Sequence, residues 1–204
     1  MKKQITYKRA GDGFQCDVFR EDGFTFSVYF RNEPSPRKYK RMGLSDLHAC
    51  TMALFDAVED THTRIWMDNL YVSSLFCRAA YGHNKKVLVA GVARVSRGVP
   101  KVVMQHVEKD KKKPLALKGT LRATVLEGDN RCSQLVACSF YDSKPVYFIS
   151  MVAESIDGIT KERKVFDKDE QVVTPMEFSR LHMTDDNNNN MYKVDIANQL
   201  RNYY

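Results

Sequence analysis

The spacing of apolar residues changes twice between residues 64 and 92, and this predicts a strand, a helix and a second strand. RIWM at 64–67 is short and apolar-rich, and the run at 87–92 is apolar and β-branched. Between them, four apolar residues recur at helical spacing: Val72, Leu75, Phe76 and Ala79. Two strands joined through one helix are expected to pair in parallel, with a right-handed crossover.

This strand–helix–strand unit makes Asp68 the first candidate site residue. Asp68 follows the first of the two strands directly, so it is predicted to lie at that strand's carboxyl end. In open α/β sheets the loops diverge at this edge and leave the crevice in which ligands bind.

The region before this unit predicts a hairpin and a helix. Two aromatic and β-branched runs, at 14–19 and 23–30, are separated by a turn-forming Asp-Gly pair. Asp17 falls inside the first run, where burial of an unpaired carboxylate would be costly. An outward-facing position on an edge strand is the alternative to a functional role for Asp17. A helix is predicted to begin after Ser45, a suitable N-cap.

The region after residue 97 predicts mainly β structure. Strands are expected at 121–126, 135–141 and 146–152, the last two joined as an antiparallel hairpin. We therefore predict a core over 8–96, a mainly β insertion over 97–184, and a loop and final helix over 185–204.

The end of the chain supplies a third carboxylate. DDNNNN at 185–190 predicts a mobile loop. Asp195 then begins a helical pattern, and helix capping alone would explain its position. That pattern runs to the last residue, which predicts that the sequence is either a fragment or the product of a truncated gene.

The charge balance favours a polyanionic partner. Lys and Arg total 32 against 25 Asp and Glu, a net charge of +7. A basic enzyme with no nucleic-acid partner is the alternative. Candidate DNA contacts lie in three stretches, each of which could instead be a solvated surface: Arg37, Lys38, Lys40 and Arg41; Lys111, Lys112 and Lys113; and Lys161, Arg163 and Lys164.

The cysteines, the apolar runs and the histidines limit the kinds of protein that this sequence can encode. The five cysteines include no CxxC pair, so neither a disulfide framework nor a zinc site is expected, and a reducing compartment is predicted. No apolar run reaches membrane-spanning length and no secretion signal begins the chain, so a soluble intracellular protein is predicted. The five histidines show no ligand spacing, and none is assigned a role.

The contexts of Asp17, Asp68 and Asp195 fit the RNase H-like layout of DDE nucleases and transposases. The expected fold class is therefore α/β, with an RNase H-like mixed sheet in the order β-β-(β)-α-β-α-β…α, interrupted by a mainly β insertion before the last helix. Within that class, five segments resemble motifs of piggyBac transposases and piggyBac-derived proteins, over roughly residues 8–204: QCDVFREDGF at 15–24, MDNLYVS at 67–73, KVLVAGVARVSRGVP at 86–100, KPVYFISMVAE at 144–154 and MYKVDIANQLRNYY at 191–204.

The resemblance implies a specific chemistry. By this resemblance, two Mg²⁺ ions would be held by Asp17, Asp68 and Asp195, because Mg²⁺ prefers oxygen ligands. Mn²⁺ can substitute for Mg²⁺. The implied activity is phosphodiester cleavage and strand transfer on double-stranded DNA, at transposon ends and a TTAA target. It also implies a homodimer of the full-length protein and a nuclear location.

The sequence departs from the family pattern in three respects. Asn198 stands where the family has a fourth carboxylate, and Tyr192-Lys193 where it has Gly-Gly. The cysteine-rich zinc domain that follows the core and the helical segments that precede it are missing. Two other hypotheses therefore remain open: a domesticated or truncated derivative that binds DNA or a partner without cutting, and a cellular RNase H-like nuclease.

Overall fold

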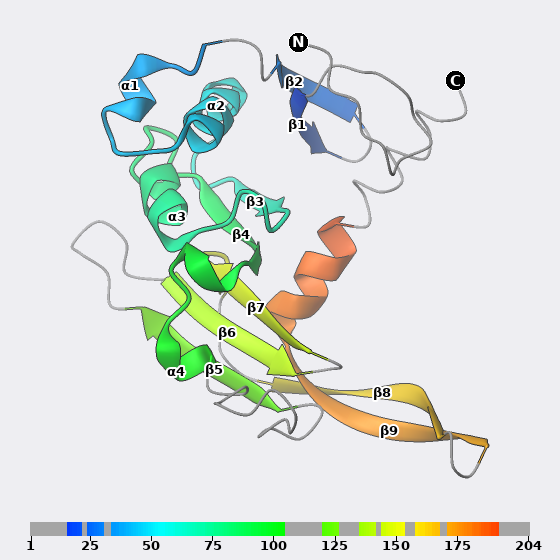
Figure 1. Ribbon diagram of the computed structural model, residues 1–204. Helices are drawn as coiled ribbons and strands as arrows, with labels where there is room; N and C mark the ends of the chain where they lie inside the picture. Colours follow the sequence, from blue (N-terminus) through cyan, green and yellow to red (C-terminus); the bar gives the residue numbers. More distant parts are fainter. Residues whose placement is uncertain are drawn as a thin grey trace, which may run out of the picture.

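A computed structural model (Figure 1) describes most of the chain, in eight stretches. These stretches are residues 16–21, 24–30, 34–104, 120–126, 135–141, 144–153, 158–167 and 171–191. The described part is a mixed α/β structure whose largest sheet has five strands.

The five-stranded sheet has the order β3-β4-β7-β6-β5. Its strands are β3 (Arg64–Met67), β4 (Leu88–Ala93), β5 (Leu121–Leu126), β6 (Leu135–Tyr141) and β7 (Pro145–Ser150). β3 and β4 pair in parallel, and the other neighbours are antiparallel. The predicted strands, the parallel pair and the β6–β7 hairpin are confirmed.

Two capped helices precede and connect the parallel strands. α2 (Asp46–Leu54) begins after Ser45, whose side chain accepts a hydrogen bond from the His48 N–H, and a short 3₁₀ turn η1 (Phe55–Ala57) follows it. α3 (Ser74–Tyr81) joins β3 to β4, and its N-cap Ser73 accepts from the Phe76 N–H. Each cap satisfies a backbone donor that the first helical turn leaves unpaired.

The RKYKR stretch is not the plain surface loop that its charge predicts. It forms a short helix, α1 (Arg37–Lys40), in which Tyr39 is buried. Tyr39 belongs to the main hydrophobic core, so burial of this aromatic side chain helps to hold the basic segment against the protein.

Apolar side chains cover both faces of the sheet. On one face, alternate residues of β4, β6 and β7 pack with α2 and α3, among them Val89, Ala137 and Ile149. On the other face, Val136, Cys138 and Phe148 pack with Leu181 and Met183. Figure 1 shows the helices α2 and α3 on one side of β3 and β4, and a further helix, coloured orange, on the other.

That further helix, over residues 182–191, corrects the prediction of a mobile loop at 185–190. Its buried residues, Met183, Thr184 and Asn187, recur at helical spacing, so one face of the helix covers the sheet. Asp185 lies in its first turn, where negative charge suits the helix dipole. Tertiary burial thus outweighs the weak helix propensity of the asparagine run.

Two antiparallel pairs lie outside the five-stranded sheet in the described part of the chain. β1 (Cys16–Glu21) and β2 (Phe24–Phe30) form the predicted hairpin. β8 (Gly158–Asp167) and β9 (Val172–Leu181) form a long ribbon that the sequence analysis missed; Figure 1 shows it extending away from the sheet. The RNase H-like strand order stays a prediction, and so does the division of the chain into core, insertion and C-terminal segment at residues 97 and 185. In the structure, β5, β6 and β7 share one sheet with β3 and β4.

After β4 the chain makes a 3₁₀ turn, η2 (Val95–Arg97), and a short helix, α4 (Lys101–Met104). None of the helices in the described stretches is long and apolar enough to cross a membrane.

The parallel strands approach each other most closely at Gly91. Gly91 pairs with Met67, the residue before Asp68. A Cβ atom at Gly91 would lie 2.1 Å from the Met67 carbonyl oxygen and 2.9 Å from Val72 Cγ2. The absence of a side chain at this position therefore allows the strand ends, and the turn that carries Asp68, to come together.

We expect Gly91→Ala to lower the free energy of unfolding by about 2 kcal/mol or more, because the new methyl group overlaps backbone atoms. For a chain of this length each kcal/mol corresponds to about 2–4 °C in Tm. Gly158→Ala is the matched control, since a Cβ atom there meets nothing closer than 3.6 Å. Equal melting temperatures for the two variants would contradict this explanation.

Candidate functional site

Asp68 lies where the sequence places it, directly after β3 at the carboxyl edge of the parallel pair, and it is exposed. Its Oδ1 accepts a hydrogen bond from the Asn69 N–H at 2.6 Å, and its backbone carbonyl accepts from the Tyr71 N–H at 3.0 Å. These two bonds form a tight turn that fixes the carboxylate at the start of the β3–α3 connection. Within the described stretches the carboxylate makes no ion pair, so it remains available to a ligand.

A buried histidine contacts the backbone of this turn. His48, in α2, stacks on Phe76 with 4.6 Å between ring centroids, and its Nε2 lies 2.8 Å from the Tyr71 carbonyl oxygen. A carbonyl can only accept, so Nε2 carries the proton. Burial lowers the pKa of His48, and nearby Arg97 lowers it further, against the opposing effect of the Tyr71 carbonyl. His48 is therefore a neutral hydrogen-bond donor that supports the turn after Asp68.

An arginine beside Asp68 was missed by the sequence analysis. Arg94 directly follows β4 and is exposed, and its Nε and Nη2 lie 3.3 and 3.2 Å from Asn69 Oδ1. Since Asn69 is the next residue after Asp68, the guanidinium is held close to the carboxylate. The signal was present in the sequence: Arg94 follows the second parallel strand, and the carboxyl ends of neighbouring parallel strands meet at one edge.

The other two predicted ligands cannot be compared with Asp68. Asp17 lies in β1, where its backbone pairs with Tyr29, but its side chain lies outside the described part of the structure. Asp195 and Asn198 also lie outside it. Among the residues that are described, no three His, Cys, Asp or Glu side chains form a metal-binding group. The convergence of the three aspartates stays a prediction.

The predicted DNA contacts at 37–41 are partly used within the protein. Lys38 forms an ion pair with Asp56 at 3.0 Å, and Lys40 forms one with Asp46 at 2.6 Å. Arg37 and Arg41 are exposed and make no ion pair with any described residue. The two arginines are thus the better candidates of this stretch.

The other two basic stretches provide fewer candidate DNA contacts among the described residues. Lys111, Lys112 and Lys113, and the side chain of Arg163, lie outside the described residues. Lys161 is paired with Asp185, which also contacts Arg180, whereas Lys164 is exposed.

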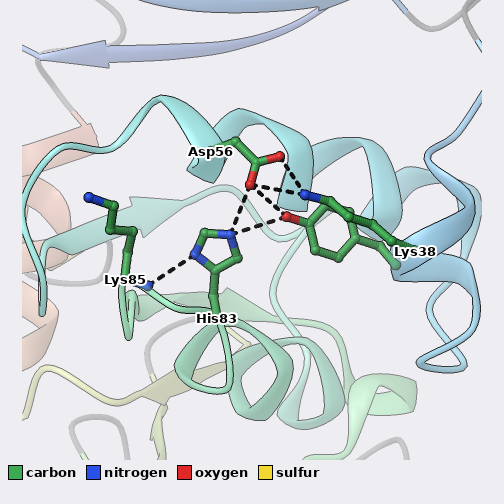
Figure 2. A network of polar contacts seen from close by, with 5 residues as sticks. Lys38, Asp56, His83 and Lys85 are labelled. Atoms are coloured by element: carbon green, nitrogen blue, oxygen red, sulfur yellow. Dashed lines mark hydrogen bonds and ion pairs between the residues drawn. The ribbon is translucent and has the colours of Figure 1, made fainter.

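Figure 2 shows a second polar cluster. It includes His83, which follows the C-terminal end of α3, whereas Asp68 precedes the N-terminal end of that helix. Asp56 Oδ1 accepts a hydrogen bond from the Tyr39 hydroxyl at 2.8 Å and lies 3.1 Å from His83 Nε2. The Lys85 N–H donates to His83 Nδ1, so the neutral imidazole carries its proton on Nε2, facing Asp56. Asp56, although exposed, is the centre of this network.

The Asp56 cluster joins three elements that are distant in sequence. Lys38 and Tyr39 come from α1, Asp56 from η1, and His83 from the end of α3. An open cavity of about 260 Å³ adjoins it. Burial raises the pKa of Asp56, but hydrogen bonds from Lys38, Tyr39 and His83 outweigh burial and hold that pKa below its usual value. We interpret the cluster as the anchor of α1.

Comparison with known proteins identifies the fold. No family model matches the chain, and no curated protein sequence matches it significantly. The structure is similar to the cryo-EM structure of a piggyBac transposase synaptic complex with hairpin DNA, with a TM-score of 0.64 and 16% sequence identity. The similarity covers 98% of this chain and 36% of the transposase chain, so this chain spans little more than a third of that protein. The chain therefore has a piggyBac-like fold.

We expect Asp56→Asn to lower the free energy of unfolding at pH 6 by about 1 kcal/mol, because a charged acceptor of several hydrogen bonds becomes neutral. The pKa of Asp56 is depressed in the folded state, so its contribution is present above the unfolded pKa and is lost as the pH falls through the folded value. The difference between wild type and variant, measured by urea unfolding, should shrink below pH 3.8, the usual pKa of aspartate. Asp60→Asn, at an exposed aspartate nearby, should change nothing. A difference for Asp56→Asn that does not decrease as the pH falls from 6 to 3 would contradict this interpretation.

Proposed function

We propose that the chain is the catalytic part of a piggyBac-like DDE transposase that cleaves and joins DNA at the edge marked by Asp68. One observation carries the proposal. An exposed carboxylate lies at the carboxyl end of a parallel strand, in a fold similar to that of a piggyBac transposase over 98% of this chain.

In this proposal the three aspartates act together. The hairpin that carries Asp17 would lie beside β3, in the RNase H-like order, and Asp195 would approach from the C-terminal segment. Asp68 suits a hard cation, because its carboxylate is exposed and offers the oxygen ligands that Mg²⁺ prefers. When bound, two Mg²⁺ ions supply activation of the attacking oxygen and stabilisation of the leaving one.

Arg94 would supply the positive charge that this edge needs. A cluster of carboxylates repels the phosphate backbone, and a guanidinium held beside it offsets the repulsion and can bind a phosphate in a bidentate manner. The contact with Asn69 orients the Arg94 side chain before DNA arrives. Arg37, Arg41, Lys111, Lys112 and Lys113 would extend this contact along the duplex.

The remaining parts of the proposal concern the full-length protein. Its substrates would be transposon ends and a TTAA target, it would act as a homodimer, and it would work in the nucleus. A derivative that binds DNA without cutting it is the competing function, and the first experiment below separates the two.

We expect Asp68→Asn to abolish Mg²⁺- or Mn²⁺-dependent strand cleavage while DNA binding and the fold survive, because the change removes a ligand charge and keeps the side-chain shape. Cleavage of a labelled transposon-end duplex, with circular dichroism as the check on folding, measures this. Asp186→Asn, at an exposed aspartate on the 182–191 helix, is the matched control. Equal cleavage by wild type and Asp68→Asn would rule out the active site; binding without cleavage by the wild type would favour the non-cutting derivative.

We expect Arg94→Gln to reduce the slope of log affinity against log salt by about 0.9, the value for one phosphate contact on duplex DNA. Binding to one duplex is measured over a salt series by fluorescence anisotropy. Arg122→Gln serves as the control, because Arg122 is an exposed arginine on the edge strand β5, far from Asp68. If the two variants have the same slope, Arg94 does not contact phosphate.

A further inference from the structure

Val95 is an exposed apolar residue in the turn that follows Arg94. Val95 is 50% exposed in the 3₁₀ turn η2. Leu75, in the first turn of α3, is 54% exposed. Single exposed aliphatic residues are ordinary on protein surfaces, so exposure alone does not assign these two residues a function. The residues around them must be considered.

The turn that carries Val95 is closed by a backbone hydrogen bond, and the residue after it packs closely against α3. The Arg97 N–H donates to the Arg94 carbonyl at 2.9 Å, which closes η2. Gly98 then takes a left-handed conformation with φ of 86°, and a Cβ atom there would lie 2.0 Å from Ser74 Oγ. Leu75 follows Ser74 directly, so this close approach joins the segment after η2 to the start of α3, where Leu75 lies.

Positive charge borders this apolar pair. Arg94 directly precedes Val95 and Arg97 follows two residues later, so two positive charges flank Val95 in the chain. Arg94 contacts Asn69, the residue after Asp68. A turn that carries an exposed aliphatic side chain between two arginines has the chemistry of a duplex-DNA contact in which apolar groups meet bases and cations meet phosphates.

We propose that Val95 is an apolar wedge that presses on a base step of duplex DNA and partly unstacks it next to Asp68. This inference rests on the proposed function and adds a positioning role that no charged residue can supply. Aliphatic side chains inserted at a step kink the duplex, and pyrimidine–purine steps such as TA yield most easily. A kink beside Asp68 would turn the phosphate backbone toward the carboxylate edge.

A duplex with 2-aminopurine in place of adenine at a TA step tests the wedge, because unstacking raises the fluorescence of this base. We expect saturating wild-type protein, bound in low salt, to increase the fluorescence. Val95→Ala should lose most of that increase, whereas Val95→Leu should keep it. The salt slope of binding should be the same in all variants, because no phosphate contact is lost.

Val125→Ala is the matched control: Val125 is 54% exposed on β5, at the opposite edge of the sheet from Asp68, and its variant should behave as wild type. A full fluorescence increase with Val95→Ala at saturation would overturn the wedge, and so would wild-type binding with no increase; both outcomes leave the proposed function standing. A wild-type protein that does not bind the duplex would remove the proposed function and the wedge together. If Val95→Ala does not fold, an increase retained by Val95→Asn overturns the wedge, and its loss supports it.

Discussion

The position of Asp68 depends on the close approach of two parallel strands. At Met67 and Gly91 the backbones are so near that a single methyl group on Gly91 would overlap the Met67 carbonyl. This approach brings the ends of β3 and β4 to one edge, so that Asp68 and Arg94, 26 residues apart in the chain, are bridged by Asn69. The candidate site is therefore a consequence of strand packing, and the chemistry proposed for it needs no flexible loop to assemble this pair.

The positive charges of the chain are divided between structural and exposed roles. Lys38 and Lys40 neutralise carboxylates of α2 and η1 and so hold α1 on the core. Arg94 makes only neutral contacts within the described residues, so its full charge is directed to the surface beside Asp68. A count of basic residues in sequence thus overestimates the charge available to DNA at 37–41 and misses the arginine with the most favourable position.

The parts of the fold set by local patterns could be predicted from the sequence. The strands β3 and β4, the cap Ser45 and the position of Asp68 follow from spacing and connection rules that involve few residues at a time. The helix at 182–191 was missed because burial of Met183 and Asn187 against the sheet, a long-range effect, outweighs the preference of asparagine for turns. The β8–β9 ribbon was missed because GITKERKVFD has too many charges to read as a strand. The Asp56 network escaped prediction since its residues come from three separate segments.

The central claim is that Asp17, Asp68 and Asp195 converge on one metal-binding edge, and metal-directed cleavage of the protein backbone tests it most directly. Fe²⁺ replaces Mg²⁺ at oxygen-ligand sites and, with ascorbate and peroxide, generates radicals that cut the chain close to the bound ion. Peptide mapping by mass spectrometry should find cuts around all three aspartates in the wild-type protein, suppressed together by excess Mg²⁺. Cuts near Asp68 without cuts near Asp17 and Asp195, or cuts that Mg²⁺ does not suppress, would contradict the account.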